Sequence, residues 1–152
     1  MSASNLSGVD QYLYVAEPPA TYLVRPALVI DCSVLSAFMF DEETRDEALA
    51  MMAGKTLHAP YLLDHEIVSV ALKKERLGWS MDSIHLAIAD YPKQNIELHR
   101  TDTLVQHQLA VRYKLSSYDA AYLWLAAELK APLATFDQKL WRAATTHLSN
   151  LP

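Results

Sequence analysis

Residues 27–31 read Ala-Leu-Val-Ile-Asp, a short apolar run closed by an acid, and this stretch decides the fold class. A continuous apolar run of this length is typical of a strand buried on both faces, as the strands of parallel sheets are. Further short strands are expected at residues 57–59, 95–99 and 132–135, with helical segments between them. Strands that alternate with helices predict an α/β sandwich with a short, mostly parallel sheet flanked by helices.

The helical segments are marked by apolar spacing and by capping residues. Residues 61–77 repeat apolar side chains at helical spacing, and Gly78 follows them as a C-cap. Ser80 is an N-cap candidate for a helix that runs to about residue 90. Residues 116–130, rich in Ala and Leu, form the clearest helix. Other helices are expected at residues 33–39, 41–52, 102–113 and 138–144, and a last edge strand at 147–151.

Length and composition predict one globular domain preceded by an arm. The chain has 152 residues, of which 51% are hydrophobic and 20% charged, as in an ordinary soluble domain. Residues 1–26 differ from the rest by their Ser and Pro content, so we expect an N-terminal arm at 1–26 and the folded domain at 27–152. Only 3 glycines are present and they are scattered, which excludes a dinucleotide-binding fingerprint. The single Cys32 excludes an internal disulfide and suits a reducing compartment.

The charge balance bears on partners and location. The formal net charge is −5, and an acidic chain does not hold nucleic acid through bulk charge, although bound cations can bring it to phosphate. The chain has no apolar run of 18 residues and no basic segment followed by an apolar one, so neither a membrane span nor a signal peptide is predicted. We therefore expect a cytoplasmic protein.

Four acids are placed where chemistry is expected in such a sheet. Asp31 and Asp137 follow predicted strands, while Glu66 and Asp119 lie near the starts of predicted helices. The carboxyl ends of parallel strands meet at one edge, so these four side chains are expected to converge. Converging carboxylates repel one another unless a cation joins them, and Mg²⁺ or Mn²⁺ prefers oxygen ligands. Such an ion activates water and clamps a phosphodiester.

Each acid also has a purely structural explanation. Asp31 and Asp137 fit N-caps, and Asp119 follows Ser116 at capping-box spacing. Glu66 fits an exposed helix face as well as a partnered, inward one. The individual signals leave both interpretations open, and the joint placement favours the functional one.

Four sequence motifs occur in order between Ala27 and Ala144. They are the segment 28–35, the segment 59–67 in which a helix after Pro60 carries Glu66, the segment Leu-Ser-Ser-Tyr-Asp-Ala-Ala-Tyr at 115–122, and the segment Pro-Leu-Ala-Thr-Phe-Asp-Gln-Lys-Leu at 132–140. Together they resemble the PIN domain family, specifically the small VapC-type toxin ribonucleases. The third motif is the most specific.

The resemblance implies a PIN-like three-layer sandwich that cleaves RNA with Mg²⁺ or Mn²⁺. It implies an acidic site in which each member binds a metal or orients its water: Asp31, Glu66, Asp119 and Asp137. Ser33 and Thr135 would supply supporting hydroxyls. It also implies a homodimer and an antitoxin partner. The alternative is a non-catalytic PIN-like module that binds RNA or a protein.

Further residues resemble parts of known site motifs. His65-Glu66 begins like a zinc-protease motif, but Ser69 stands where the second His is required. His99 and His107 are separated by a strand-to-helix break, so no zinc site is predicted from them. Basic residues that are candidates to contact RNA phosphates, or else form solvated helix faces, are Lys73, Lys74, Arg76, Lys139 and Arg142.

Overall fold

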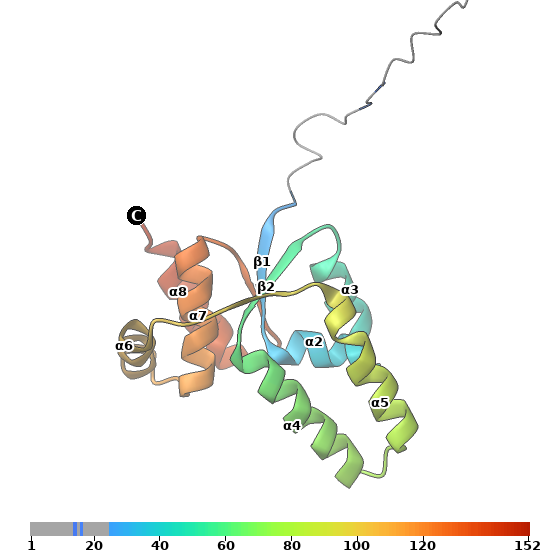
Figure 1. Ribbon diagram of the computed structural model, residues 1–152. Coiled ribbons are helices and arrows are strands. Elements are labelled where there is room, and N and C mark those ends of the chain that lie inside the picture. The colour runs from blue at the N-terminus through green and yellow to red at the C-terminus, as the bar shows by residue number, and fades with distance from the viewer. Residues whose placement is uncertain (1–13, 15, 17–24) are drawn as a thin grey trace, which may run out of the picture.

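Four short parallel strands form the central sheet of the computed structural model, which describes residues 14, 16 and 25–152 (Figure 1). In spatial order they are β3 (Glu97–His99), β2 (Thr56–Pro60), β1 (Ala27–Ile30) and β4 (Leu133–Ala134). β1 lies inside the sheet, since Leu28 pairs with Leu57 on one side and Val29 with Leu133 on the other. Val29 and Ile30 are fully buried, as their apolar run predicts. The predicted α/β fold with a parallel sheet is confirmed.

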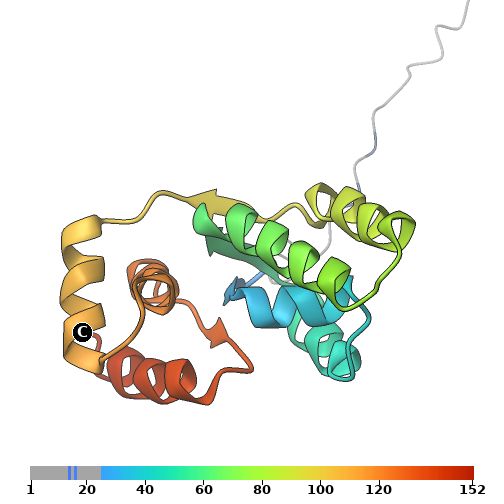
Figure 2. The same ribbon diagram turned by 90° about the horizontal axis from the view of Figure 1, so that it is seen from below.

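Helices cover both faces of this sheet. They are α2 (Cys32–Met39), α3 (Arg45–Met52), α4 (Leu62–Arg76), α5 (Met81–Asp90), α6 (Thr103–Tyr113), α7 (Ser117–Leu129) and α8 (Gln138–Ser149), with a short 3₁₀ turn at Pro92–Gln94. Figure 2 shows α2 to α5 on one side of the strands and α6 to α8 on the other. The predicted three-layer arrangement is therefore confirmed. None of the helices in the described part of the chain is long and apolar enough to cross a membrane.

Side-chain caps set where the helices begin. Asp31 accepts a hydrogen bond from the backbone N–H of Val34 at the start of α2. Ser80 caps α5 in the same way, as its position in the sequence predicts. Gly78 lies just after α4 and has a φ of +91°. A residue with a Cβ rarely adopts this backbone conformation. These local signals explain why most predicted boundaries agree with the structure to within a residue or two.

The helix expected at residues 41–52 begins four residues later, at Arg45. Asp41 has a φ of +48°, in the left-handed region, so the right-handed helix cannot include it. Instead the backbone N–H of Arg45 bonds the carbonyl of Glu42 and the segment before α3 is a turn. The helical spacing of Ala48 and Met52, both buried, belongs to the shorter helix.

The edge strand expected at residues 147–151 is wrong, because α8 continues to Ser149. Leu140 and Ala144 are buried and Leu148 packs against the same core, which is a four-residue helical period. The ring of His147 also packs edge-on against Tyr113, with its Nδ1 3.0 Å from the tyrosine hydroxyl. Burial along one helix face thus extends α8 and leaves β4 at the edge of the sheet.

The main core lies on both faces of the sheet, with α2, α3 and α4 packed on one face and α7 on the other. Tyr122, Leu123 and Leu125 of this helix are almost fully buried, which explains its uniformly apolar sequence. A second, smaller cluster gathers around Phe40, between α2, α4 and α5. The predicted arm lies outside the described residues apart from positions 14, 16, 25 and 26, and its division from the domain at residue 27 stays a prediction.

Candidate active site

Asp31 stands at the carboxyl end of β1 and is almost completely enclosed, with 6% of its surface exposed. Its Oδ1 accepts hydrogen bonds from Ser33 Oγ at 2.6 Å and from the backbone N–H of Val34 at 3.2 Å. Its Oδ2 accepts from Thr135 Oγ1 at 2.5 Å. Burial raises the pKa of Asp31 above its usual 3.8, while these hydrogen bonds act in the opposite direction. The carboxylate is therefore held in one orientation at an energetic cost that a nearby cation would offset.

The loop between β4 and α8 is tied to the same carboxylate. Ser33 Oγ accepts from the backbone N–H of Phe136 at 3.0 Å, and Thr135 Oγ1 accepts from that of Asp137 at 2.9 Å. Each hydroxyl thus donates to Asp31 and receives from the loop. This double link sets the position of Asp137 relative to Asp31, two residues that are far apart in the sequence.

Glu66 projects from the second turn of α4 and is partly buried. Its Oε1 accepts a hydrogen bond from the hydroxyl of Tyr122, on α7, at 2.7 Å. Burial raises the pKa of Glu66, the bond from Tyr122 lowers it, and the charges of Asp31 and Asp119 raise it further. Glu66 therefore has a fixed partner and faces two other acids, which rules out the exposed-face interpretation.

Asp119 and Asp137 occupy the first turn of α7 and the N-cap of α8. Burial raises the pKa of Asp119, and the charges of Asp137 and Asp31 raise it further. Asp137 is exposed, and its Oδ1 accepts from the backbone N–H of Leu140 at 2.8 Å. The capping explanation therefore holds for Asp137 and for Asp31, and both residues lie within electrostatic reach of Asp119 at the same time.

All four predicted acids are thus brought to one place by four separate segments of the chain. Within residues 14, 16 and 25–152, none of them pairs with a Lys or Arg. Lys139 only lowers the pKa of Asp119 slightly against the larger opposing causes. Burial and mutual repulsion without a paired cation make the set unfavourable as it stands.

The donor set fits a hard divalent cation. Every side chain offers oxygen, which suits Mg²⁺ or Mn²⁺ better than a softer metal. No three of these carboxylates lie within 4.8 Å of one another in the described part of the chain, so they surround a space wider than one compact ligand cage. Mg²⁺ usually keeps several waters and takes only one or two carboxylates directly, which such a space accommodates. Burial raises the pKa of the neighbouring Cys32 to about 12, which keeps this thiol protonated and unreactive at neutral pH.

Comparison with known proteins agrees with this geometry. The family model described as PIN domain matches residues 28–145, which includes every acid of the site. The chain belongs to the PIN domain family and is of the VapC type. It is 31% identical over 117 residues to VapC ribonuclease Mb0985 of Mycobacterium bovis and to Ribonuclease VapC9 of Mycobacterium tuberculosis, covering 74% of this chain and 87% of each relative.

The fold of this PIN domain is also similar to a solved structure. The crystal structure of PAE2754 from Pyrobaculum aerophilum aligns with a TM-score of 0.62 over 83% of this chain and 96% of the other. Sequence identity in this alignment is 21%, so the likeness concerns the fold alone.

One groove of the PIN domain reaches Glu66, and another begins at Gln138, the residue after Asp137. One, of about 530 Å³, is lined by Glu66 and by the exposed side chains of Lys73 and Tyr118. The other, of about 500 Å³, is lined by Lys139 and Arg142. Of the basic residues that are predicted to contact phosphate, three line these grooves: Lys73, Lys139 and Arg142.

Lys74 is placed differently. Its Nζ lies 3.2 Å from Glu42 Oε1 and 5.0 Å from the centre of the Trp79 ring. Only 15% of its side chain is exposed, so it serves the packing of α4 rather than a groove.

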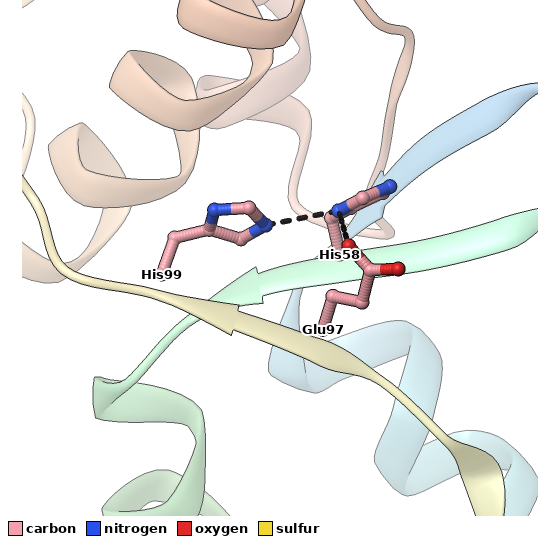
Figure 3. Close-up of side chains that lie close together, drawn as sticks. All are labelled: His58, Glu97 and His99. Atoms are coloured by element: carbon pink, nitrogen blue, oxygen red, sulfur yellow. Dashed lines mark hydrogen bonds and ion pairs between the residues drawn. The ribbon is translucent and has the colours of Figure 1, made fainter.

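Sequence reasoning missed one cluster, on the neighbouring strands β2 and β3. His58, Glu97 and His99 place three ligand atoms within 4.8 Å of one another (Figure 3). His107 is the nearest histidine to His99 in the sequence, whereas the histidine that His99 contacts, His58, lies 41 positions away. The available signal was the spacing of Glu97 and His99, two apart on a predicted strand and therefore on one face.

Proposed function

We propose that this PIN domain is a Mg²⁺- or Mn²⁺-dependent endoribonuclease that hydrolyses RNA phosphodiester bonds. The observation that carries the proposal is the convergence of four carboxylates, none of which pairs with a Lys or Arg among the described residues. A divalent ion bound there supplies an acidified water and offsets the charge that develops on the phosphate. The names of the curated relatives, both ribonucleases, support RNA as the substrate.

In this proposal each residue of the site has a separate role in binding the ion, orienting water or holding a ligand. Asp31 and Asp119 are the most direct ligands, while Glu66 and Asp137 bind the ion or orient water. Ser33 and Thr135 hold Asp31 through their hydroxyls. Hydroxyl donors to a ligating carboxylate keep it oriented and so raise the affinity of the site.

The two grooves are proposed to hold the RNA on either side of the acids. Lys73 on α4 and the pair Lys139 and Arg142 on α8 would contact phosphates. Tyr118, with 61% of its surface exposed beside Glu66, is a stacking surface for a base. A net charge of −5 makes these local cations important, because the chain as a whole repels RNA.

The test is cleavage of a mixed RNA pool by the purified protein in Mn²⁺, Mg²⁺ or EDTA, with a matched DNA pool in parallel. We expect cleavage of RNA only, in either metal, and none in EDTA. Asp31→Asn and Asp119→Asn should each abolish it. Asp82→Asn, which removes an equal charge from the exposed first turn of α5, is the control and should leave the rate unchanged.

The rival function, a non-catalytic module, predicts a different result. A folded wild type that binds Mn²⁺ in calorimetry, binds RNA and yet cleaves nothing under any condition would contradict the nuclease. In that case Asp119→Asn should leave RNA binding unchanged or strengthen it, since one repulsive charge is lost. Cleavage of DNA in preference to RNA would contradict the substrate class alone.

We also propose that the protein is the toxin of a toxin–antitoxin pair, acts in the cytoplasm and forms a homodimer. Its VapC relatives support the first point. Exposed apolar side chains of α4, of α5 and of the turn between them support a protein partner, because exposed apolar surface marks interfaces. They are Val68, Leu72, Leu77, Met81 and Leu86, each at least 47% exposed.

Two measurements test the toxin role and the homodimer. Induced expression in a bacterial host should arrest growth for the wild type and not for Asp119→Asn. Light scattering should give twice the chain mass for the wild type and the single mass for Leu72→Glu, which places a charge in the apolar surface. A monomeric wild type would contradict the homodimer.

A further inference from the structure

The parallel strands β2 and β3 carry a second cluster of ligating side chains, separate in chemistry from the four acids. His58 is in register with Glu97, and Pro60 with His99, so the three side chains project from the same face of the sheet. Figure 3 shows the two imidazole rings and the carboxylate turned toward one another. His58 Nδ1 lies 2.9 Å from His99 Nε2 and 3.4 Å from Glu97 Oε2.

The protonation of this cluster leaves room for a cation. Two ring nitrogens 2.9 Å apart share one proton, because two N–H groups pointing at each other would clash. His58 is buried, with 8% of its surface exposed. The two facing nitrogens therefore hold one proton and one lone pair between them. The carboxylate of Glu97 supplies negative charge beside them. A metal ion can take the place of the shared proton, which moves to the other nitrogen of its own ring, and can then bond to all three side chains.

One ligand separation already fits a tetrahedral ion of the zinc type, and a second is close to it. Ligands about 2.0–2.1 Å from a tetrahedral centre are about 3.4 Å apart, the separation already present between His58 and Glu97. The two imidazoles need to move apart by about half an ångström to reach the same spacing. Two imidazoles with one carboxylate form a nitrogen-rich set that Zn²⁺ prefers and Mg²⁺ does not.

We propose that His58, Glu97 and His99 form a Zn²⁺ site that cross-links β2 to the edge strand β3. The fourth position belongs to water or to an outside ligand, since three protein groups leave one open. β3 is only three residues long, and the backbone N–H of Tyr61 bonds the carbonyl of His99 just where α4 begins. Zinc therefore stabilises the strand pair from which the helix bearing Glu66 starts.

The test measures Zn²⁺ bound per chain by competition with a chromophoric zinc indicator, in excess Mg²⁺ so that the acids are occupied. The same titration is repeated in the Asp31→Asn, Asp119→Asn double variant. We expect one Zn²⁺ per chain in both proteins. Equal zinc content in these two proteins assigns the ion to the histidine cluster, whether or not the protein proves to be a nuclease.

Ligand variants give the second arm. Loss of a residue that only hydrogen-bonds a metal ligand lowers metal affinity about 10- to 100-fold. Loss of a ligand itself, in His99→Ala or Glu97→Gln, should therefore lower the affinity for Zn²⁺ by at least about a hundredfold. His107→Ala, which removes an exposed histidine from α6, should bind like the wild type. Glu97 is largely exposed and its Gln variant keeps the shape, so misfolding does not explain a loss there.

Histidine ring resonances in the wild type complete the assignment. Of 6 histidines, Zn²⁺ should shift those of His58 and His99 and no others. Thermal unfolding should move to higher temperature with Zn²⁺ in the wild type and not in Glu97→Gln. Failure of the wild type to hold zinc in excess Mg²⁺, wild-type affinity in His99→Ala, or shifts at other histidines would overturn the proposal.

Discussion

Thr135 donates a hydrogen bond from its Oγ1 to Oδ2 of Asp31 at 2.5 Å, across 104 positions of sequence. The same hydroxyl accepts from the backbone N–H of Asp137, so one side chain joins the end of β1 to the start of α8. Both aspartates belong to the proposed site. Thr135 is therefore the residue through which the fold sets the relative position of two of its acids.

Thr135→Val tests this link, because it keeps the side-chain shape and removes the hydroxyl. We expect the free energy of unfolding to fall by about 1–3 kcal/mol, since a buried carboxylate and a backbone N–H each lose a partner. Urea denaturation measures the change. Thr145→Val is the matched control, because that hydroxyl bonds only an exposed carbonyl within α8. A loss no larger than in the control would show that the link contributes nothing.

Tyr122→Phe removes the donor to Glu66. The phenol lies in the core with 1% exposure, so we expect a loss of about 1 kcal/mol in unfolding free energy. Its bond lowers the pKa of Glu66, so the variant should have a still higher pKa at that carboxyl and protons should compete with Mn²⁺ up to a higher pH. Calorimetric Mn²⁺ titrations over a pH series show this. Tyr113→Phe, at the remote bond to His147, should leave the Mn²⁺ profile unchanged.

The metal-free protein should lose stability as pH rises past the usual carboxyl range. Burial, with the charges of Asp137 and Asp31, raises the pKa of Asp119 above 3.8, so in the window above that value the folded state binds more protons than the unfolded one. Stability from this group is fully present below 3.8 and falls as pH rises through the folded pKa.

Asp119→Asn should remove the fall in folding stability that the ionisation of Asp119 causes as pH rises. In EDTA we expect the variant to melt at a higher temperature than the wild type at neutral pH, with the difference shrinking on acidification. Differential scanning fluorimetry over a pH series measures it, with Asp82→Asn as the charge control. A variant that is less stable than the wild type at neutral pH would mean that Asp119 is not repelled in the folded state.

The neighbouring Lys73 and Lys74 should separate binding from stability. Lys73→Ala should weaken RNA affinity and reduce its salt dependence, because an exposed groove cation is lost. Lys74→Ala should leave RNA affinity unchanged and lower unfolding free energy by about 1 kcal/mol, since its contacts with Glu42 and Trp79 are internal. Fluorescence anisotropy in the Asp119→Asn background, which prevents cleavage, gives the affinities. Equal RNA affinities in the two variants would contradict the proposal that RNA binds in the groove lined by Lys73.

Much of the fold was predictable because its signals are local. The apolar run at 27–30, the Ser and Asp caps and Gly78 each act within a few residues, and the structure agrees with them. The tail was predicted wrongly because its helical state depends on burial of Leu148 and on the contact of His147 with Tyr113. Those contacts come from elements distant in the sequence.

The candidate sites divide in the same way. The four acids could be anticipated because each lies just after a strand or within the first two turns of a helix, and parallel topology brings such positions to one edge. The cluster of His58, Glu97 and His99 could not, since nothing in the sequence says that residue 58 pairs with residue 97. Strand register is a long-range property and side chains on neighbouring strands meet only once it is set.

By itself the sequence determined the α/β class and the family, and it predicted the four acids of the site, because alternation, capping and motif order are encoded along the chain. Only the tertiary structure decided how those acids are held. The bonds of Thr135 to Asp31 and of Tyr122 to Glu66 join residues 104 and 56 positions apart. The physical reason is that hydrogen bonding and burial act through space, whereas propensity and periodicity act along the chain.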